Sequence, residues 1–207
     1  MKTELVYFDY GNVICTDPDP HFFNYISRIT SRSVDEVKSI FIKYFQPFMS
    51  DQITEKEFYE IAVDEFKGSF TIEQISRWFP EVYTPHLKPK KEILHVAKRI
   101  RDKGIKTGIL SNIVTPLIRV CRENLYYAGF SPLILSPIAG SSKPDMEIYK
   151  IALRESGVKA SSVVFIDDKE KYLEPARELG FRTVHFNNNN ESASDLERKL
   201  IEAGVVI

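Results

Sequence analysis

From residue 90 onward, short apolar runs alternate with segments whose apolar residues recur at helical spacing. This alternation is typical of strand–helix units that build a parallel sheet. Together with an apolar run near the start of the chain, the runs predict strands at 5–8, 106–110, 133–135, 163–166 and 183–186. The segments between them predict helices over about 90–103, 115–128, 145–156, 170–179 and 192–203. The sequence therefore predicts an α/β fold with a doubly wound parallel sheet.

Residues 16–86 interrupt this alternation with a purely helical pattern. Apolar and aromatic residues recur at helical spacing through the segment, and two helix starts carry capping-box patterns, Ser33 with Glu36 and Thr54 with Glu57. We expect about four helices here, whose aromatic side chains form a core of their own. The predicted division is an α/β core at 1–15 and 87–207, with a small helical-bundle cap at 16–86 inserted after the first strand.

The composition limits the classes of partner. The chain of 207 residues has 28 Lys and Arg against 29 Asp and Glu, which gives no basic footprint for nucleic acid or an anionic membrane. We expect neither partner. The N-terminal apolar run is too short for a signal segment, and the two cysteines, Cys15 and Cys121, form no CxxC pair. These features favour a cytoplasmic location, while the oligomeric state stays open.

Polar residues follow four of the predicted strands. Asp9 follows the first, Ser111 and Asn112 the second, Lys143 lies in the loop after the third, and Asp167 and Asp168 follow the fourth. Taken singly, an Asp, Ser or Asn here is most often the start of the next helix, and a lysine is an ordinary surface residue. However, the carboxyl ends of parallel strands meet at one edge, where ligands bind. The combination therefore predicts a site.

A carboxylate, a hydroxyl and a lysine at one edge suit phosphoryl transfer through an aspartyl-phosphate. A carboxylate nucleophile divides one difficult displacement into two easier ones. Its approach to a phosphate dianion is repulsive, so a hard cation such as Mg²⁺, held by carboxylate oxygens, would have to neutralise charge. The lysine adds a compact positive charge, and the hydroxyl binds a phosphoryl oxygen.

Four motifs in order resemble those of the haloacid dehalogenase superfamily. VYFDYGNVI is similar to its first motif, ILSN to the second, SSKPDMEIY to the third, which carries a lysine, and VVFIDD to the fourth. The resemblance spans essentially the whole chain and implies a Rossmann-like core, with the helical insert as a small cap of the family's type.

The resemblance also implies roles for particular residues. Asp9 would be the nucleophile, and Lys143 would hold charge at the reaction centre. Mg²⁺ would be bound by Asp168, the Asp9 carboxylate and the Gly11 carbonyl. Two further roles complete the set: Ser111, with Asn112 beside it, would bind the phosphoryl group, and Asp167 would either orient Lys143 or reach the metal through water.

Two positions depart from the family's common pattern. Gly11 stands where the second Asp of a DxD motif protonates the leaving oxygen and later activates water, a contribution of about 10²–10⁴-fold. A branch of phosphatases is similar in having Gly there; Asp17 and His21 are the nearest candidates for a replacement acid. Tyr172 stands where the family usually has Asp or Asn near the metal, which predicts weaker metal binding.

The function predicted from these residues is a Mg²⁺-dependent phosphatase of a small phosphorylated metabolite, with a sugar phosphate as the expected substrate. Two alternatives remain open. The chain could bind a phosphorylated ligand without turnover, which Gly11 and Tyr172 favour. It could also be a 2-haloacid dehalogenase, although the related dehalogenases usually lack the acidic pair represented here by Asp167 and Asp168.

Overall fold

A five-stranded parallel sheet forms the centre of the protein. The computed structural model describes residues 2–124 and 126–207. The strands are β1 (Leu5–Phe8), β2 (Lys106–Ser111), β3 (Leu133–Leu135), β4 (Val163–Asp167) and β5 (Arg182–His185), in the order β3-β2-β1-β4-β5. Chain order reverses beside β1, as it does in doubly wound sheets. The predicted α/β fold is confirmed.

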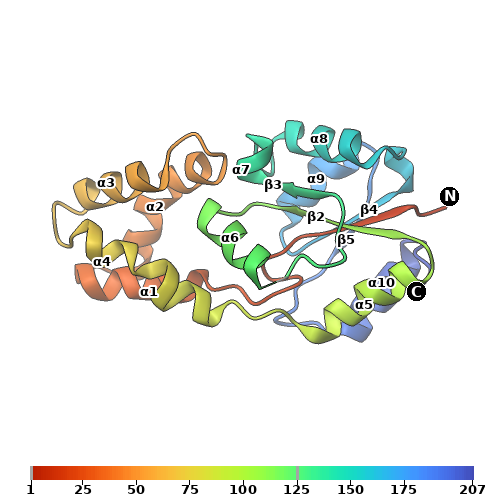
Figure 1. Ribbon diagram of the computed structural model, residues 1–207, viewed down its shortest axis with the longest axis horizontal. Coiled ribbons are helices and arrows are strands. Elements are labelled where there is room, and N and C mark those ends of the chain that lie inside the picture. The colour runs from red at the N-terminus through yellow and green to blue at the C-terminus, as the bar shows by residue number, and fades with distance from the viewer. Residues whose placement is uncertain (1, 125) are drawn as a thin grey trace.

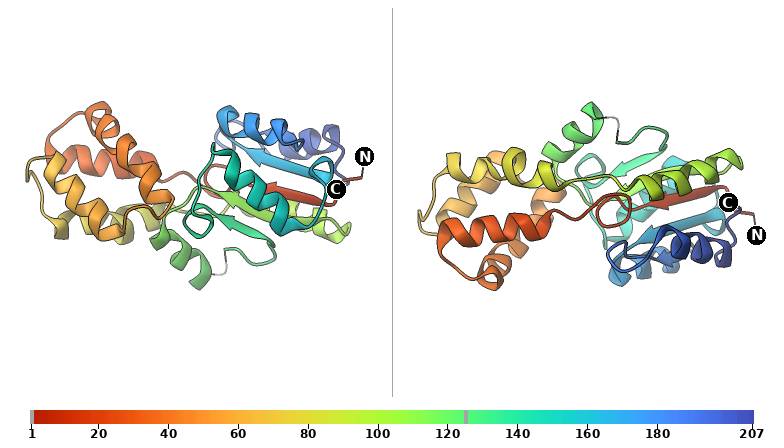
Figure 2. Two further views of the ribbon diagram at one scale, coloured as in Figure 1. Left: turned by 90° about the horizontal axis from the view of Figure 1, so that it is seen from above. Right: turned by 90° about the horizontal axis from the view of Figure 1, so that it is seen from below.

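Helices cover both faces of the sheet (Figures 1 and 2). Val6 and Phe8 pack in one cluster with residues of α5 (Lys91–Asp102), α6 (Thr115–Glu123) and α10 (Ala193–Glu202). Leu5 and Tyr7 face the opposite side, toward α8 (Met146–Ser156) and α9 (Glu170–Glu178). Because successive side chains of a strand point to opposite faces, a strand buried on both sides must be apolar throughout, as β1 is.

The predicted element bounds agree with the structure to within a residue or two, with one exception. The helix predicted over 115–128 ends at Glu123, and residue 125 lies outside the described part of the chain. The short α7 (Ser136–Ala139) and the 3-10 turn η3 (Ala160–Ser162) were not predicted. The strand predicted at 183–186 begins and ends one residue earlier, as β5.

The segment between β1 and α5 is helical, as predicted. It contains α1 (Asp19–Thr30), α2 (Val34–Met49), α3 (Glu55–Glu65), α4 (Ile72–Ser76), the π-helix η1 (Trp78–Tyr83) and the 3-10 turn η2 (Thr84–His86). Both predicted capping boxes are present, at the starts of α2 and α3. Aromatic rings fill the space between these helices; Phe41, for example, packs against Phe22, Phe58 and Phe66. The exact domain division at 16 and 86 stays a prediction.

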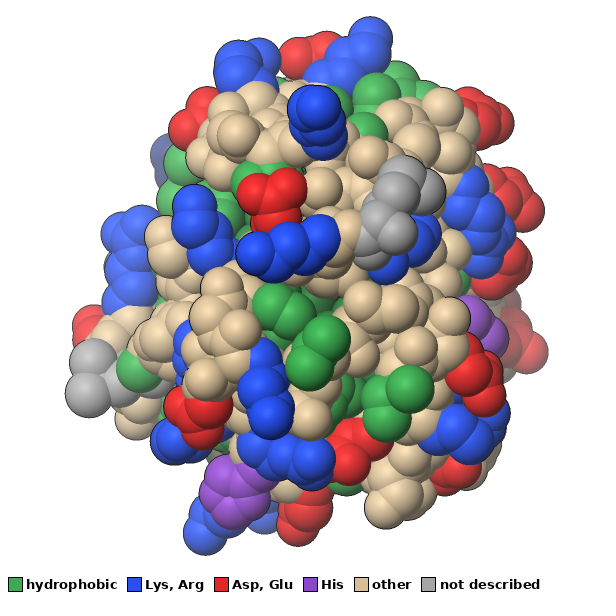
Figure 3. Space-filling model, turned by 90° about the vertical axis from the view of Figure 1, so that its right-hand side faces the viewer, with side chains coloured by type: hydrophobic (Ala, Val, Ile, Leu, Met, Phe, Trp, Pro, Cys, Tyr) green, Lys and Arg blue, Asp and Glu red, His purple; other side chains and the backbone are tan. Residues whose placement is uncertain are grey.

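The insert lies beyond the carboxyl ends of the strands, while both chain ends lie at the far end of the core (Figure 1). At that far end, acidic and basic side chains are interspersed over the surface (Figure 3). Within the described residues, no helix combines the length and the apolar character needed to cross a membrane. The sheet edge that faces the insert is therefore the place to examine for a site.

We expect Gly108→Ala to destabilise the protein by about 1–3 kcal/mol, the usual cost of overpacking a dense core. A Cβ at Gly108 would lie 2.7 Å from both the Pro132 carbonyl oxygen and Tyr7 Cε1. The Tyr7 ring is not free to move, since its hydroxyl donates to the Ala152 carbonyl at 2.8 Å. Urea denaturation measures the loss. Gly11→Ala is the control: apart from its chain neighbours, no described residue has an atom within 4 Å of the added Cβ, so equal losses in both variants would contradict the argument.

Candidate active site

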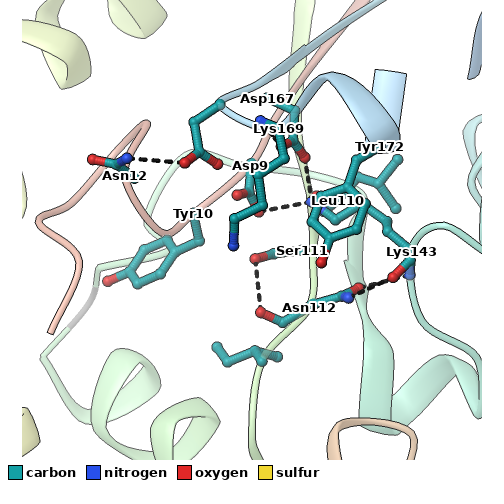
Figure 4. A network of polar contacts seen from close by, with 12 residues as sticks. Asp9, Tyr10, Asn12, Leu110, Ser111, Asn112, Lys143, Asp167, Lys169 and Tyr172 are labelled. Atoms are coloured by element: carbon teal, nitrogen blue, oxygen red, sulfur yellow. Dashed lines mark hydrogen bonds and ion pairs between the residues drawn. The ribbon is translucent and has the colours of Figure 1, made fainter. Parts of the chain in front are cut away.

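The structure brings the predicted site residues together at the carboxyl edge of the sheet (Figure 4). Asp9 follows β1, Ser111 ends β2, and Asp167 ends β4, with Asn112 and Asp168 one residue further on. Lys143 comes from the loop between α7 and α8. The pairing of β1 with both β2 and β4 places these strand ends side by side. The predicted convergence of these residues is thus present in the structure.

Lys143 is the centre of this group. Its side chain is fully buried, and its ammonium donates to Asp9 Oδ1 at 2.9 Å, to Asp167 Oδ2 at 2.5 Å and to the Leu110 carbonyl at 3.1 Å. Burial alone would lower the pKa of Lys143, but the carboxylates of Asp167 and Asp9 outweigh it and raise the pKa above its usual value. Lys143 therefore stays charged at neutral pH and holds Asp9 in place.

Asp167 has both carboxylate oxygens engaged by the protein. Oδ2 accepts from Lys143, and Oδ1 accepts from the Lys169 backbone N–H at 2.9 Å. Burial raises the pKa of Asp167, and the charge of Lys143 opposes that shift. Of the two roles considered for Asp167, the structure shows the contact with Lys143. A metal contact through water stays a prediction.

Three carboxylates at the edge could hold a metal ion. Asp9, Asp167 and Asp168 each offer an oxygen, and these oxygens lie within 4.8 Å of one another. Asn12 adds to the arrangement, since its Nδ2 donates to Asp168 Oδ2 at 2.9 Å from a left-handed backbone conformation, φ 58°. Hard oxygen donors of this kind fit Mg²⁺, which keeps part of its water shell. Gly11, predicted to add its carbonyl, lines the same cavity.

Ser111 and Asn112 occupy different positions in the group. Ser111 is 1% exposed and lines the cavity, and its hydroxyl makes only a long contact of 3.4 Å with the Asn112 carbonyl, so it remains available to a ligand. The Asn112 amide instead clasps the Lys143 backbone: its Nδ2 donates to the carbonyl and its Oδ1 accepts from the N–H, both at 2.8 Å. This contact positions the loop that carries Lys143. The predicted role of Asn112 in substrate binding stays a prediction.

Tyr172 and Lys169 give the site a feature that the sequence did not reveal. The Tyr172 ring centroid lies 5.0 Å from Lys143 Nζ and 5.6 Å from Lys169 Nζ, so the ring covers the buried lysine and contacts a second one. Such placement suits a cation–π contact. Burial alone would lower the pKa of Lys169, but the Tyr172 phenol, and then the carboxylates nearby, raise the pKa above its usual value. Lys169 therefore brings a second positive charge to the cavity, which it lines.

The two candidates for a replacement acid differ in position. His21 stacks on His86, with ring centroids 3.6 Å apart, and lines a separate small cavity. Asp17 lines the cavity of Asp9, where its Oδ1 accepts from the Asp19 backbone N–H at 3.0 Å. Sequence reasoning did not single out Asp19, which lines the same cavity. Burial, then the charge of Asp17, raises the pKa of Asp19 to about 6.

The cavity has a volume of about 380 Å³ and runs from the polar group to the insert. Its polar end contains Asp9, Ser111 and Lys143. Its other walls are largely apolar, and they include apolar residues of α1, α2 and η1 of the insert. Cys15 is buried and also borders the cavity.

We expect Lys143→Met to lower the free energy of unfolding by about 3–5 kcal/mol at pH 7, the usual cost of leaving a buried charge without its partner. Burial already raises the pKa of Asp167, and without the opposing charge of Lys143 its folded-state pKa should rise further above the unfolded value. The stability of a carboxyl whose pKa is raised by folding is retained at low pH and lost as pH rises through the folded-state pKa. The deficit should therefore be small near pH 4 and grow toward pH 7, as urea denaturation across this range would measure. The control is Lys150→Met at an exposed site on α8; a deficit independent of pH would contradict the ion-pair explanation.

Comparison with known proteins agrees with the motifs. A family model described as haloacid dehalogenase-like hydrolase matches residues 5–180. Among solved structures, a HAD family enzyme from Bacteroides thetaiotaomicron, in complex with magnesium and inorganic phosphate, superposes with a TM-score of 0.77 at 21% identity. The superposition covers 94% of this chain and 98% of that one. At this identity, the likeness establishes the fold.

Two curated relatives have narrower matches. A sesquiterpene phosphatase from Aspergillus oryzae is 24% identical over 54% of this chain and 58% of its own length. A glyceraldehyde 3-phosphate phosphatase from Methanocaldococcus jannaschii is 30% identical over 47% of this chain and 44% of its own length. The chain thus spans about half the length of these relatives. The family model, in contrast, spans most of the chain and includes the strands that carry Asp9, Ser111 and Asp167, and this chain belongs to the haloacid dehalogenase-like hydrolases.

Proposed function

We propose that the protein is a Mg²⁺-dependent phosphatase that hydrolyses a small phosphate monoester through an aspartyl-phosphate on Asp9. The observation that carries the proposal is the position of the Asp9 carboxylate. It lines a cavity, accepts from the buried ammonium of Lys143, and has an oxygen within 4.8 Å of oxygens of Asp167 and Asp168. This is the arrangement that a carboxylate nucleophile needs, because it is oriented and its charge is partly balanced before substrate arrives.

The residues of the chain divide the work of the reaction. An Asp9 carboxylate oxygen attacks phosphorus, and the ester oxygen leaves. Lys143 orients Asp9, while Lys143 and Ser111 stabilise the negative charge on the phosphoryl oxygens. Mg²⁺ bound by Asp9, Asp168 and the Gly11 carbonyl would screen the repulsion between carboxylate and phosphate. Water then hydrolyses phospho-Asp9 and regenerates the carboxylate.

The relatives support the reaction more than they support one substrate. Two curated relatives are named as phosphatases, and the solved relative was crystallised with magnesium and phosphate. The finer prediction, a sugar phosphate, rests on the motif resemblance alone. The cavity adds no support for it, because the walls beyond the polar end are mostly apolar.

The test is phosphate release from p-nitrophenyl phosphate and a panel of metabolite esters, with and without Mg²⁺. We expect activity that is lost on chelation and that falls at least about 10⁴-fold in Asp9→Asn, a typical size of loss for a covalent nucleophile. Asp64→Asn, an exposed carboxylate on α3, is the control and should retain full activity. When the ester is radiolabelled at phosphorus, the labelled phosphoryl group should become attached to the native protein but not to the Asp9→Asn variant.

Two other outcomes would lead to the alternatives. Magnesium-dependent binding of phosphate esters with no turnover in any of them would support a ligand-binding protein. Release of halide from a 2-haloacid, with phosphate esters untouched, would support a dehalogenase. Either outcome would overturn the proposal that the protein is a phosphatase.

A further inference from the structure

Apolar side chains line much of the cavity beyond its polar end, although Lys38 also lines it. Six of the apolar side chains are here named the apolar chamber: Phe23, Ile42, Phe45, Met49, Trp78 and Leu117. They come from α1, α2 and η1 of the insert and from α6 of the core. The chamber is therefore formed by the insert and the core together, and it belongs to the same cavity as Asp9, Ser111 and Lys143.

The polar atom of the largest chamber residue points elsewhere. Trp78 is 1% exposed, and its indole N–H donates to the Tyr59 hydroxyl at 3.1 Å. Thr16, a polar residue beside the chamber, has its hydroxyl engaged as well: it donates to the His86 carbonyl and accepts from the Lys88 N–H at 2.9 Å. A sugar hydroxyl placed against this wall would lose its water without gaining a partner from these groups, which is unfavourable.

Ile42, in contrast, favours an apolar ligand. Its side chain is 74% exposed although it borders the cavity, so a ligand with an apolar group would cover it. Burying apolar surface of this kind is favourable in proportion to the area removed from water. Phe23 and Phe45, with ring centroids 6.0 Å apart, continue the same wall.

We propose that the substrate is a phosphate monoester of an apolar alcohol, whose organic group occupies the apolar chamber while its phosphoryl group meets Asp9. This inference rests on the proposed phosphatase function for turnover, but not for binding. It replaces the expected sugar phosphate by an ester whose leaving group is an apolar alcohol.

The binding test uses n-alkylphosphonates, which are not hydrolysed, from methyl to hexyl, titrated into the native protein with Mg²⁺ by calorimetry. Affinity should rise roughly fourfold for each methylene, the equivalent of about 0.8 kcal/mol for a buried CH₂. Ile42→Asn should reduce the ratio of hexyl to methyl affinity several-fold. Ile72→Asn is the matched control, because Ile72 is an isoleucine on α4 that is 42% exposed and outside the cavity lining.

Affinity that is independent of chain length, or that changes equally in both isoleucine variants, would overturn the apolar chamber as the binding site. The turnover test is separate: kcat/KM for hexyl phosphate should exceed that for glucose 6-phosphate. A preference for glucose 6-phosphate would overturn the substrate class while leaving the phosphatase intact. Phosphonate affinity that rises with chain length, with no ester turned over, would keep the binding inference and overturn the phosphatase.

Acidic residues at the start of α1 offer a replacement for the acid that Gly11 cannot supply. Asp19 is the first residue of α1 and lines the cavity of Asp9 and Asp168. Burial, then the charge of Asp17, raises its pKa; Lys169 and the Tyr83 hydroxyl oppose the shift, and Asp168 adds to it. A carboxyl that is partly protonated near neutral pH is suited to donate a proton and to take one back.

We propose that Asp19 is the general acid and base for the reaction at Asp9. As the Asp9 oxygen–phosphorus bond forms and the ester bond breaks, the Asp19 carboxyl gives its proton to the leaving alkoxide, which departs as the alcohol. The Asp19 carboxylate then takes a proton from the water that attacks phospho-Asp9. Phosphate leaves, and both carboxyl groups return to their starting states.

The test compares two leaving groups in Asp19→Asn. Hexyl phosphate needs a proton on its poor leaving group, so its kcat/KM should fall at least about 10²-fold. p-Nitrophenyl phosphate releases a stable phenolate, so its first step should change only a few-fold. Because the proton donor must be protonated, the native kcat/KM for hexyl phosphate should fall as pH rises through the pKa of Asp19, and this basic limb should disappear in the variant. Adding Gly11→Asp to the variant should restore part of the hexyl activity, since the described structure has open space at that Cβ. Equal losses for both esters, or no recovery with Gly11→Asp, would overturn the assignment.

Discussion

The buried ammonium of Lys143 is the contact on which the rest of the site depends. Its partners come from the ends of three adjacent strands: Asp9 after β1, the Leu110 carbonyl in β2 and Asp167 at the end of β4. A buried cation is stable only where several acceptors surround it, so the order β2-β1-β4 and its parallel register are required for the site. Two further contacts hold the lysine: the Asn112 amide, which follows β2, binds its backbone, and the Tyr172 ring of α9 lies 5.0 Å from its ammonium.

The sequence was sufficient for the sheet because its strands are buried on both faces. Such strands are apolar throughout, and Gly or polar residues mark their ends clearly. Prediction was weaker where burial is partial: β5 lies at an edge, its residues Arg182 to His185 are mixed in polarity, and the prediction was shifted by one residue. The turn of π-helix after α4 could not be predicted either, since apolar spacing does not separate neighbouring helix types.

The same division applies to the candidate site. Residues that follow strands directly, such as Asp9 and Asp168, could be located from the sequence because parallel strands end at one edge. Asn12, Lys169 and Asp19 could not, because their contacts depend on a left-handed turn, a loop conformation and the packing of the insert against the core. A GN pair after the strand was the one available signal for Asn12, since Asn tolerates that backbone conformation.

The net charge around the cavity limits both the metal that the site needs and the acid that the insert can supply. Leaving Asp19 aside, the carboxylates around the cavity formally exceed the ammonium groups by one negative charge: four carboxylates, Asp9, Asp17, Asp167 and Asp168, against three ammonium groups, Lys38, Lys143 and Lys169. A phosphate dianion entering this site would meet net repulsion, which a divalent cation reverses. A further ionised carboxylate would increase that repulsion, whereas a protonated one would not. Asp19, at the start of α1, lines the same cavity and has a pKa that burial and its acidic neighbours raise. It can therefore supply the acid that Gly11 lacks without adding a full negative charge to the site.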